Sequence, residues 1–380
     1  MTSKQPNLGA LARQFQIDGE LATVHAYGTG HINDSYCAVF YHQGLPRRGL
    51  LQRINTAIFK NPADLMENIR RVTSHVEAKL CCQPGGDRRV LALIPTREGQ
   101  AWHRDEDGGC WRMYRFVDES HTYDSVQSPQ QAFQVAAAFG QFQNLLSDLP
   151  APRLNDTIPD FHNTVLRWAA FAGAVAADPA NRACDAKPEI EFAFAHQSIA
   201  GVLLSAKLPE RVTHNDCKLN NVLFDDTTGQ ALCVIDLDTV MPGLSLYDFG
   251  DMVRTATTAA QEDEPDVARV SMQFPMFAAL VRGYLSTAGE FLTREEKQHL
   301  ALAGKLLAFE QGIRFLTDYL AGDPYYKIHR PNHNLDRCRT QFKLLQSIEQ
   351  QEDTMHQLIS RLLDQPDQPD QPDQPDQPTD

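Results

Sequence analysis

A short polar segment in the middle of the chain combines the residue types that acid–base and metal chemistry require. It runs from Thr213 to Asn221 and contains Asp216, and Asp236 follows after two apolar stretches. A carboxylate can accept a proton from a hydroxyl group, and carboxylate and amide oxygens are ligands that Mg²⁺ prefers. The segment therefore predicts Asp216 as the catalytic residue, and Asn221 and Asp236 as metal ligands.

The spacing within this segment is that of a kinase catalytic loop, where His-x-Asp is followed by Asn five positions after the Asp. The matching residues are His214, Asp216 and Asn221. Phosphoryl transfer needs a carboxylate beside the incoming hydroxyl and Mg²⁺ held against the nucleotide phosphates. We expect His214 to support the loop by hydrogen bonding. Taken singly, Asp216 could be a helix cap, Asn221 a turn residue and Asp236 a strand end, so the prediction depends on their combination.

Two strands are predicted between Asn221 and Asp236. Residues 221–224 and 231–235 are mostly apolar, and a polar turn that contains a glycine joins them. This pattern is typical of a β-hairpin. Because a hairpin brings its two ends together, we expect Asp236 to return beside Asn221.

The elements around this hairpin divide the chain into two parts. The first third predicts β-strands and one helix, which starts at Asn61-Pro62. The remainder predicts helices at 130–146, 165–177, 189–204, 271–285, 294–320 and 338–363. The expected fold class is α+β, a two-lobed protein-kinase-like fold with a small β-rich N-lobe and a larger helical C-lobe that carries the catalytic hairpin. The expected domains are 1–117, 118–363 and a disordered Asp-Gln-Pro repeat tail at 364–380.

Several motifs resemble the aminoglycoside phosphotransferase and choline kinase superfamily, and most closely its N-acetylhexosamine 1-kinase family. They are His214-x-Asp216-x-x-x-x-Asn221 and the segments 28–36, 51–55, 235–243, 247–251 and 312–320. The resemblance covers about residues 20 to 350. It implies an enzyme that uses ATP and Mg²⁺ to phosphorylate the anomeric hydroxyl of N-acetylglucosamine or N-acetylgalactosamine.

The predicted nucleotide-binding residues lie in the first third. Gly28 and Gly30 stand in a loop between two strands, where glycine allows backbone N–H groups to approach phosphates; a plain hairpin turn is the alternative. Kinases also use a strand lysine paired with a helix glutamate. Here the third strand offers Arg53, which could bind phosphate in a bidentate manner or lie unused on the surface. Glu67 and Glu77 are both candidate partners for Arg53.

Two further segments are predicted to contact the substrates. Residues 114–118 connect the two parts, so Phe116 and Val117 are expected to bind adenine through their backbone groups. His31 and Arg314 are candidate sugar-binding residues, although Arg314 could instead pair with Asp318 four positions later on the same helix face. Asp248 and Asp251 are expected to cap or anchor the helix that follows them.

Composition narrows the function classes. The chain has 49 acidic against 35 basic residues and a net charge of −14, which argues against generic nucleic-acid binding. The longest apolar stretch, 168–177, is too short to span a membrane. No secretory signal is visible at the start, and the eight cysteines form no C-x-x-C pair. We expect a cytoplasmic monomer with a small-molecule substrate.

Other functions remain open on sequence alone. The acceptor could be another small alcohol, such as choline, homoserine or an aminoglycoside. A metal-dependent hydrolase could use His214, Asp216, Asp236 and Asp238 around two ions. A binding module without activity is a third class, although neither the Asp nor the Asn of the motif is missing.

Overall fold

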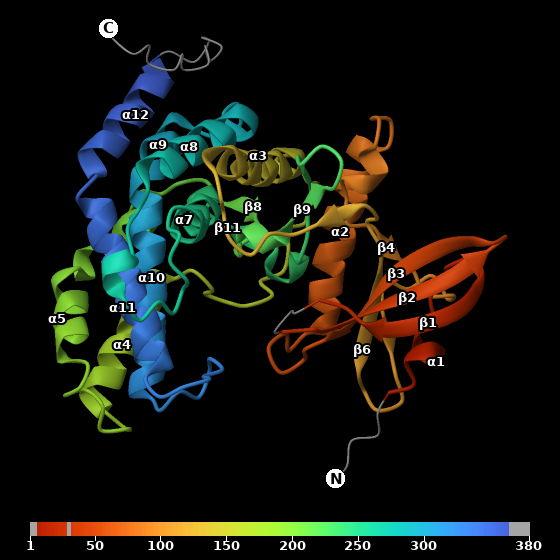
Figure 1. Cartoon of the computed structure of the whole chain (residues 1–380), viewed down its shortest axis with the longest axis horizontal. Coiled ribbons are helices and arrows are strands. Elements are labelled where there is room, and N and C mark those ends of the chain that lie inside the picture. Colours follow the sequence, from red (N-terminus) through yellow and green to blue (C-terminus); the bar gives the residue numbers. More distant parts are fainter. Residues whose placement is uncertain (1–5, 29–31, 365–380) are drawn as a thin grey trace, which may run out of the picture.

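The computed structural model describes residues 6–28 and 32–364 (Figure 1). The predictions for Gly30, for His31 and for the repeat tail beyond Asp364 therefore lie outside the described residues. In Figure 1 the N-terminal sheet, in red and orange, lies at one end of the molecule, and the green and blue helices form the other end.

An antiparallel sheet dominates the N-terminal region. Its strand order is β1-β2-β3-β6-β4, and β5 also pairs with β6. The bounds are β1 Glu20–Ala26, β2 Asp34–His42, β3 Leu45–Ile54, β4 Leu93–Ile94, β5 His103–Arg104 and β6 Cys110–Arg115. The short helix α1 (Leu8–Ala12) covers one face, where Leu11 and Phe15 pack with Phe40 and Trp111 in a small apolar core. The sheet is therefore a scaffold with its own core.

Helix α2 (Pro62–Leu80) joins this sheet to the rest of the molecule. It begins at the predicted Asn61-Pro62 pair, but the Asn61 side chain donates to Asp64 instead of capping the helix backbone. Its apolar residues belong to the main hydrophobic core, which continues through the helical region. This shared core fixes α2 against the segment that carries Asp236.

The C-terminal region is mainly helical. Its helices are α3 Pro129–Leu146, α4 Thr164–Ala177, α5 Lys187–Ala195, α6 Val202–Ser205, α7 Ser245–Ala256, α8 Phe274–Ala288, α9 Arg294–Gln298, α10 Leu300–Leu320, α11 His333–Glu349 and α12 Glu352–Asp364. Helices α3 and α8 pack closely because Gly140 and Gly283 stand at their contact. A Cβ at Gly283 would lie 2.2 Å from the Phe133 carbonyl oxygen.

Three predicted long helices are interrupted in the structure. The predicted helix 189–204 is divided into α5, a 3₁₀ turn (Gln197–Gly201) and α6. The predicted helix 294–320 is divided into α9 and α10, and the predicted helix 338–363 into α11 and α12. Helix α9 has its own capping box at Thr293, and it ends at His299, where α10 begins. Helix α12 turns away after α11 to pack on α8, α9 and α10. Tertiary packing therefore sets these breaks, which hydropathy spacing alone does not reveal.

Five short strands, in two small sheets, lie inside the described part of the helical region. Strands β9 (Val222–Asp225) and β10 (Ala231–Val234) form the predicted antiparallel hairpin, and β7 (Ser120–His121) pairs with β9. Strand β8 (Arg211–Thr213) pairs with β11 (Met241–Gly243). The two pairings hold both ends of the 213–221 segment. None of the described helices is both long and apolar enough to cross a membrane.

Candidate active site

The structure brings Asp216, Asn221 and Asp236 together, as their spacing predicts. The Asn221 Nδ2 donates to Asp216 Oδ2 at 3.1 Å and to the Asp216 carbonyl oxygen at 2.8 Å. The Ile235 N–H donates to the Asn221 carbonyl oxygen at 2.9 Å, so the end of the hairpin returns beside its start. The Asn221 Oδ1 accepts no hydrogen bond from the described part of the chain and faces no competing donor.

Asp216 forms an ion pair with Lys218, with 3.0 Å between Oδ1 and Nζ. Burial opposes ionisation of Asp216, but the charge of Lys218 lowers the pKa of its carboxyl group below the usual value. The carboxylate in turn raises the pKa of Lys218 to about 12. Asp216 is therefore ionised at neutral pH, as a proton acceptor must be. The contact of Lys218 with Asp216 was not predicted, because a lysine between two motif residues is indistinguishable in sequence from an ordinary loop residue.

His214 supports the loop in the expected way. Its Nδ1 accepts from the Asp216 N–H at 3.3 Å, and its Nε2 lies 2.9 Å from the Ile235 carbonyl oxygen. The imidazole ring meets the rings of Phe139 and Phe142 edge-on. With both nitrogens used by the backbone, His214 orients Asp216 and has no nitrogen left for a metal.

Asp248 also holds the 213–221 segment in place through hydrogen bonds. Its two oxygens accept from the backbone N–H groups of His214 and Asn215 at 2.9 and 2.7 Å, and Gln143 donates to one of them. Burial raises the pKa of the Asp248 carboxyl group. The expectation that Asp248 and Asp251 precede and cap a helix is wrong, because both lie inside α7. From that helix, Asp248 satisfies two buried N–H donors of the 213–221 segment.

Asp236 is an exposed carboxylate on a strained backbone. Its φ of 60° is in the left-handed region, which is uncommon outside glycine and occurs at functional sites. The surrounding protein atoms, together with the charges of Asp238 and Asp216, raise the pKa of Asp236 to about 6. A bound cation would offset the repulsion between these neighbouring carboxylates.

The donor set fits Mg²⁺. Asp236 and the Asn221 Oδ1 are hard oxygen ligands, and no group of three or more His, Cys, Asp or Glu within residues 6–28 and 32–364 is placed to hold a metal by itself. Protein sites for Mg²⁺ commonly supply only one or two carboxylates and leave the remaining positions to water and substrate phosphates. Asn221 and Asp236 would hold the ion, and it would neutralise phosphate charge.

Asp238 does not extend this ligand set. It forms a buried ion pair with Arg112 of β6, and Asn33 donates to its other oxygen. The Arg112 Nε also donates to Gln52 at 3.0 Å, and Gln52 donates to Ser35 at 2.9 Å. This polar chain connects three strands of the N-terminal sheet to the segment after Asp236. Arg112 was missed because a single arginine within an apolar strand pattern carries no sequence signal.

The structure describes two of the predicted phosphate-binding residues, Gly28 and Arg53. Gly28 has a φ of 77°, and a Cβ there would meet nothing within 4 Å. Arg53 is exposed, with its guanidinium over the Trp111 ring at 5.9 Å. Neither candidate partner pairs with it, since Glu67 binds Arg70 and Glu77 binds Arg115. Among the described residues, no carboxylate forms an ion pair with Arg53.

The buried polar side chain that joins α2 to the helical region is the amide of Asn68, not a glutamate. The buried Asn68 donates to the carbonyl oxygens of Asn155 at 2.8 Å and Val240 at 3.1 Å, and it accepts from the Asn155 N–H at 2.9 Å. A kinase-type ion pair between α2 and β3 is therefore replaced here by contacts between α2 and the backbone of the helical region.

The predicted adenine segment follows β6 directly. The Phe116 N–H donates to the Arg48 carbonyl oxygen at 3.2 Å, and the Phe116 ring lies against Tyr27 and Arg48. That N–H is therefore already used. The Val117 N–H, by contrast, is donated to no other described residue.

Arg314 has no carboxylate partner in the described part of the chain. Its Nη1 donates to Gln311 at 3.0 Å, and its guanidinium faces the rings of Phe161 and Tyr326. The alternative pairing with Asp318 is wrong. Asp318 instead accepts from the backbone N–H groups of Tyr325 and Tyr326, each at 2.9 Å, and so folds the loop after α10. Arg314 therefore forms no ion pair within the described residues, although the charge of the nearby Glu310 helps to raise its pKa.

A buried ionic pair, His162–Glu310, connects α10 to the 213–221 segment. The His162 Nδ1 lies 2.8 Å from Glu310, and its Nε2 lies 3.2 Å from the Asn215 carbonyl oxygen. Burial opposes both charges, but the Glu310 charge raises the pKa of His162, and His162 lowers that of Glu310. The pair was not predicted, since its members are 148 positions apart in sequence.

Asp251 carries an unusual buried oxygen near Asp216. Its Oδ1 pairs with Arg254 at 2.9 Å, whereas its Oδ2 is buried and has no hydrogen-bond partner among the described residues. After Asp216, the Asp251 charge also raises the pKa of Lys218, so this carboxylate lies within electrostatic range of the Asp216–Lys218 pair. An unpaired buried acceptor of this kind can receive a hydroxyl or an N–H group.

The site and fold define a phosphotransferase. The model of the phosphotransferase enzyme family (APH) matches residues 38–289, a range that includes the sheet from within β2 onward, α2 and the whole Asp216–Asp236 segment. The chain belongs to this family.

Solved structures show the same fold over nearly the whole chain. An aminoglycoside phosphotransferase from Alicyclobacillus acidocaldarius is 13% identical with a TM-score of 0.61, and the match covers 95% of this chain and 98% of that chain. A microcompartment-associated aminopropanol kinase is 14% identical (TM-score 0.53; 92% and 98%). A spectinomycin phosphotransferase in complex with ADP and spectinomycin is 12% identical (TM-score 0.53; 90% and 96%).

Proposed function

We propose that this phosphotransferase is an ATP-dependent kinase that phosphorylates the anomeric hydroxyl of an N-acetylhexosamine, N-acetylglucosamine or N-acetylgalactosamine. The main observation behind the proposal is that Asn221 donates directly to Asp216 and that the hairpin brings Asp236 back beside them. The sequence resemblance to N-acetylhexosamine 1-kinases supports this choice of acceptor.

In the proposed reaction, Asp216 orients the sugar hydroxyl and accepts its proton as the oxygen–phosphorus bond forms. The bond between the γ-phosphorus and the bridging oxygen breaks, and ADP leaves with that electron pair. Lys218, 3.0 Å from Asp216, supplies a positive charge beside the transferred phosphoryl group. Asn221 and Asp236 would hold Mg²⁺ against the phosphates.

The N-terminal region, residues 1–117, is the proposed nucleotide-binding lobe of a two-lobed kinase. Its candidate contacts are the Gly28 loop, the exposed Arg53 guanidinium and the free Val117 N–H. A guanidinium with no carboxylate partner can bind a phosphate without first breaking an ion pair. Residues 118–363 supply the catalytic hairpin and the acceptor site.

Two groups support a neutral acceptor rich in hydroxyl groups. Arg314 forms no ion pair, and Asp251 Oδ2 has no hydrogen-bond partner, in the described part of the chain. A guanidinium can donate to hydroxyl and carbonyl oxygens, and the carboxylate can accept from a hydroxyl or an acetamido N–H. The metal-dependent hydrolase receives no such support, because His214 and Asp238 are already engaged.

A screen of ADP release across sugars and amino alcohols tests the acceptor. We expect N-acetylhexosamines to stimulate ADP release above that of choline, homoserine, aminopropanol and aminoglycosides, and ³¹P NMR to show phosphate on the anomeric oxygen. Asp216→Asn serves as the control for contaminating kinases. Phosphate on the 6-hydroxyl, or faster turnover of an amino alcohol, would refute the sugar assignment and leave the phosphotransferase class intact.

Mg-nucleotide binding should weaken in acid. The carboxyl group of Asp236 must be ionised to bind a cation, and its pKa is raised to about 6. As the pH falls below about 6, binding must displace a proton, so affinity should fall by about tenfold per pH unit. Calorimetry of Mg-ADP between pH 5 and 8, with Asp236→Asn as the reference, measures this slope. An equal slope in both proteins would show that another group titrates.

A further inference from the structure

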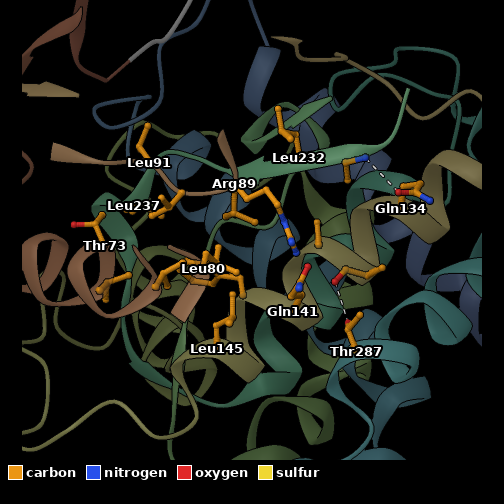
Figure 2. A pocket seen from close by; sticks show the side chains of 18 residues that line it. Thr73, Leu80, Arg89, Leu91, Gln134, Gln141, Leu145, Leu232, Leu237 and Thr287 are labelled. Atoms are coloured by element: carbon orange, nitrogen blue, oxygen red, sulfur yellow. Dashed lines mark hydrogen bonds between the residues drawn. The ribbon is translucent and has the colours of Figure 1, made fainter. Parts of the chain in front are cut away.

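A cavity of about 120 Å³ is lined in part by Leu237, the residue that follows Asp236, and Asp236 itself is not in the lining (Figure 2). Its walls come from α2, the segment 89–91, α3, β10 and α8, so it lies where the N-terminal and C-terminal regions meet. Most of the wall is hydrocarbon, supplied by Val72, Val76, Leu80, Leu91, Phe142 and Leu232. No residue proposed above to bind substrate lines it.

One end of the cavity is polar. Arg89 is the single charged residue of the lining, which contains no acid, and Figure 2 shows its guanidinium extending toward Gln141. The Arg89 Nη1 donates to Gln83 at 2.9 Å, and its other donors have no described partner. Gln141 likewise makes no side-chain hydrogen bond with the described residues. A cation and a free amide thus face the same space.

The remaining polar side chains of the wall are already satisfied. Gln134 accepts from the Ala231 N–H at 3.2 Å, Thr287 donates to the Ala137 carbonyl oxygen at 2.9 Å, and Thr73 donates to the Ile69 carbonyl oxygen at 2.8 Å. Figure 2 draws the first two of these bonds. Only Arg89 and Gln141 therefore remain to recognise a ligand.

The chemistry of the lining specifies the occupant. A volume of about 120 Å³ equals the liquid volume of about four water molecules, which suits a short alkyl chain or one ring. Apolar walls favour a hydrocarbon body over water. At the polar end, a planar guanidinium matches the two oxygens of a carboxylate, and no acidic group opposes an anion.

We propose that this cavity is a binding site for a small amphipathic carboxylate. Its hydrocarbon body would lie between α2, α3 and β10, and its carboxylate would bind Arg89 and Gln141. The site is separate from the proposed acceptor and nucleotide sites.

The cavity also contacts the segment that carries the candidate metal ligand. Leu237 lines the cavity, is 2% exposed and stands between Asp236 and Asp238 in the chain. Helix α2, which supplies another part of the wall, holds the Val240 carbonyl oxygen through Asn68. An occupant would pack against both and restrict the 236–240 segment. We infer that it tightens Mg-nucleotide binding, and this second part rests on the proposed nucleotide site.

Hexanoate is a suitable probe, with hexanamide as an uncharged control of the same shape. We expect saturable one-site binding of hexanoate by calorimetry, weaker binding of hexanamide, and a crystal soak with the carboxylate at Arg89. Arg89→Gln should weaken hexanoate binding by about tenfold or more, because a charge-assisted contact is lost. Arg70→Gln, an exposed arginine of α2 outside the cavity, should bind like the wild type.

A second variant tests the hydrocarbon part of the site. Ala138→Leu adds bulk to the α3 wall and should abolish hexanoate binding without lowering the thermal stability of the protein. Hexanoate binding that is unchanged in both Arg89→Gln and Ala138→Leu would overturn the site. These measurements need no kinase activity. If hexanoate binds but leaves the affinity for Mg-ADP unchanged, the proposed coupling through Leu237 is wrong. If Mg-ADP does not bind at all, the proposed nucleotide function is contradicted instead.

Discussion

Replacing Asp216 with Asn is expected to lower kcat by about 10²–10⁴-fold while leaving Mg-ATP binding largely unchanged. The new side chain is of the same size, and its amide oxygen can still accept from Asn221, so the 213–221 segment should keep its fold. What the variant loses is the negative charge that orients the acceptor hydroxyl and takes its proton. Steady-state turnover and calorimetry of Mg-ADP measure the two effects separately.

Asp226→Asn is the matched control for this variant. Asp226 is exposed at the turn of the β9–β10 hairpin, where it contacts His121, and its loss should leave turnover near the wild-type value. Turnover of Asp216→Asn within tenfold of the wild type would rule out Asp216 as the proton acceptor. A parallel loss of Mg-ADP binding would instead indicate that the substitution disturbs the Asn221–Asp236 pair.

The second large effect is on stability. Arg112→Met should lower the free energy of unfolding by about 3–5 kcal/mol, because Asp238 would be left charged, buried and without its ion-pair partner. Both side chains are almost fully buried, at 1% and 4% exposure, so water cannot replace the lost contact. Urea unfolding followed by circular dichroism measures the difference.

A double variant and a control make this prediction specific. Arg112→Met combined with Asp238→Asn removes both charges and should regain part of the lost stability, since a buried pair is often nearly neutral when both members are replaced. Arg53→Met, on the neighbouring strand and exposed, should change the free energy of unfolding by no more than about 0.5 kcal/mol. Equal losses for Arg112→Met and Arg53→Met would contradict a structural role for the Arg112–Asp238 pair.

The sequence predicted the parts of the site that are local in the chain. Asp216 and Asn221 lie in one loop, and Asp236 returns to them through a hairpin whose polar turn and apolar strands are readable from residue types. The two structural regions follow from the change between alternating and helical hydrophobic patterns. The long C-terminal helices were predicted without their breaks, because these depend on packing between distant helices.

Contacts between distant residues could not be predicted in the same way. Asp248 was placed before its helix, although it lies inside α7 and supports a loop 33 and 34 positions away. Arg112 meets Asp238 across 126 positions, and no pattern in either segment indicates the other. The proposed pairing of Arg314 with Asp318 relied on helix geometry, but the backbone of the following loop competes successfully for the Asp318 carboxylate.

The contacts of Asn68 also affect how the protein responds to its medium. The Asn68 amide is uncharged and binds two carbonyl oxygens and one N–H of the helical region. Dissolved ions screen exposed charges but have little influence on buried neutral hydrogen bonds. The contacts of Asn68 should therefore persist in dilute buffer and in concentrated salt, whereas the exposed ion pair between Lys79 of α2 and Asp148 should weaken as salt screens it.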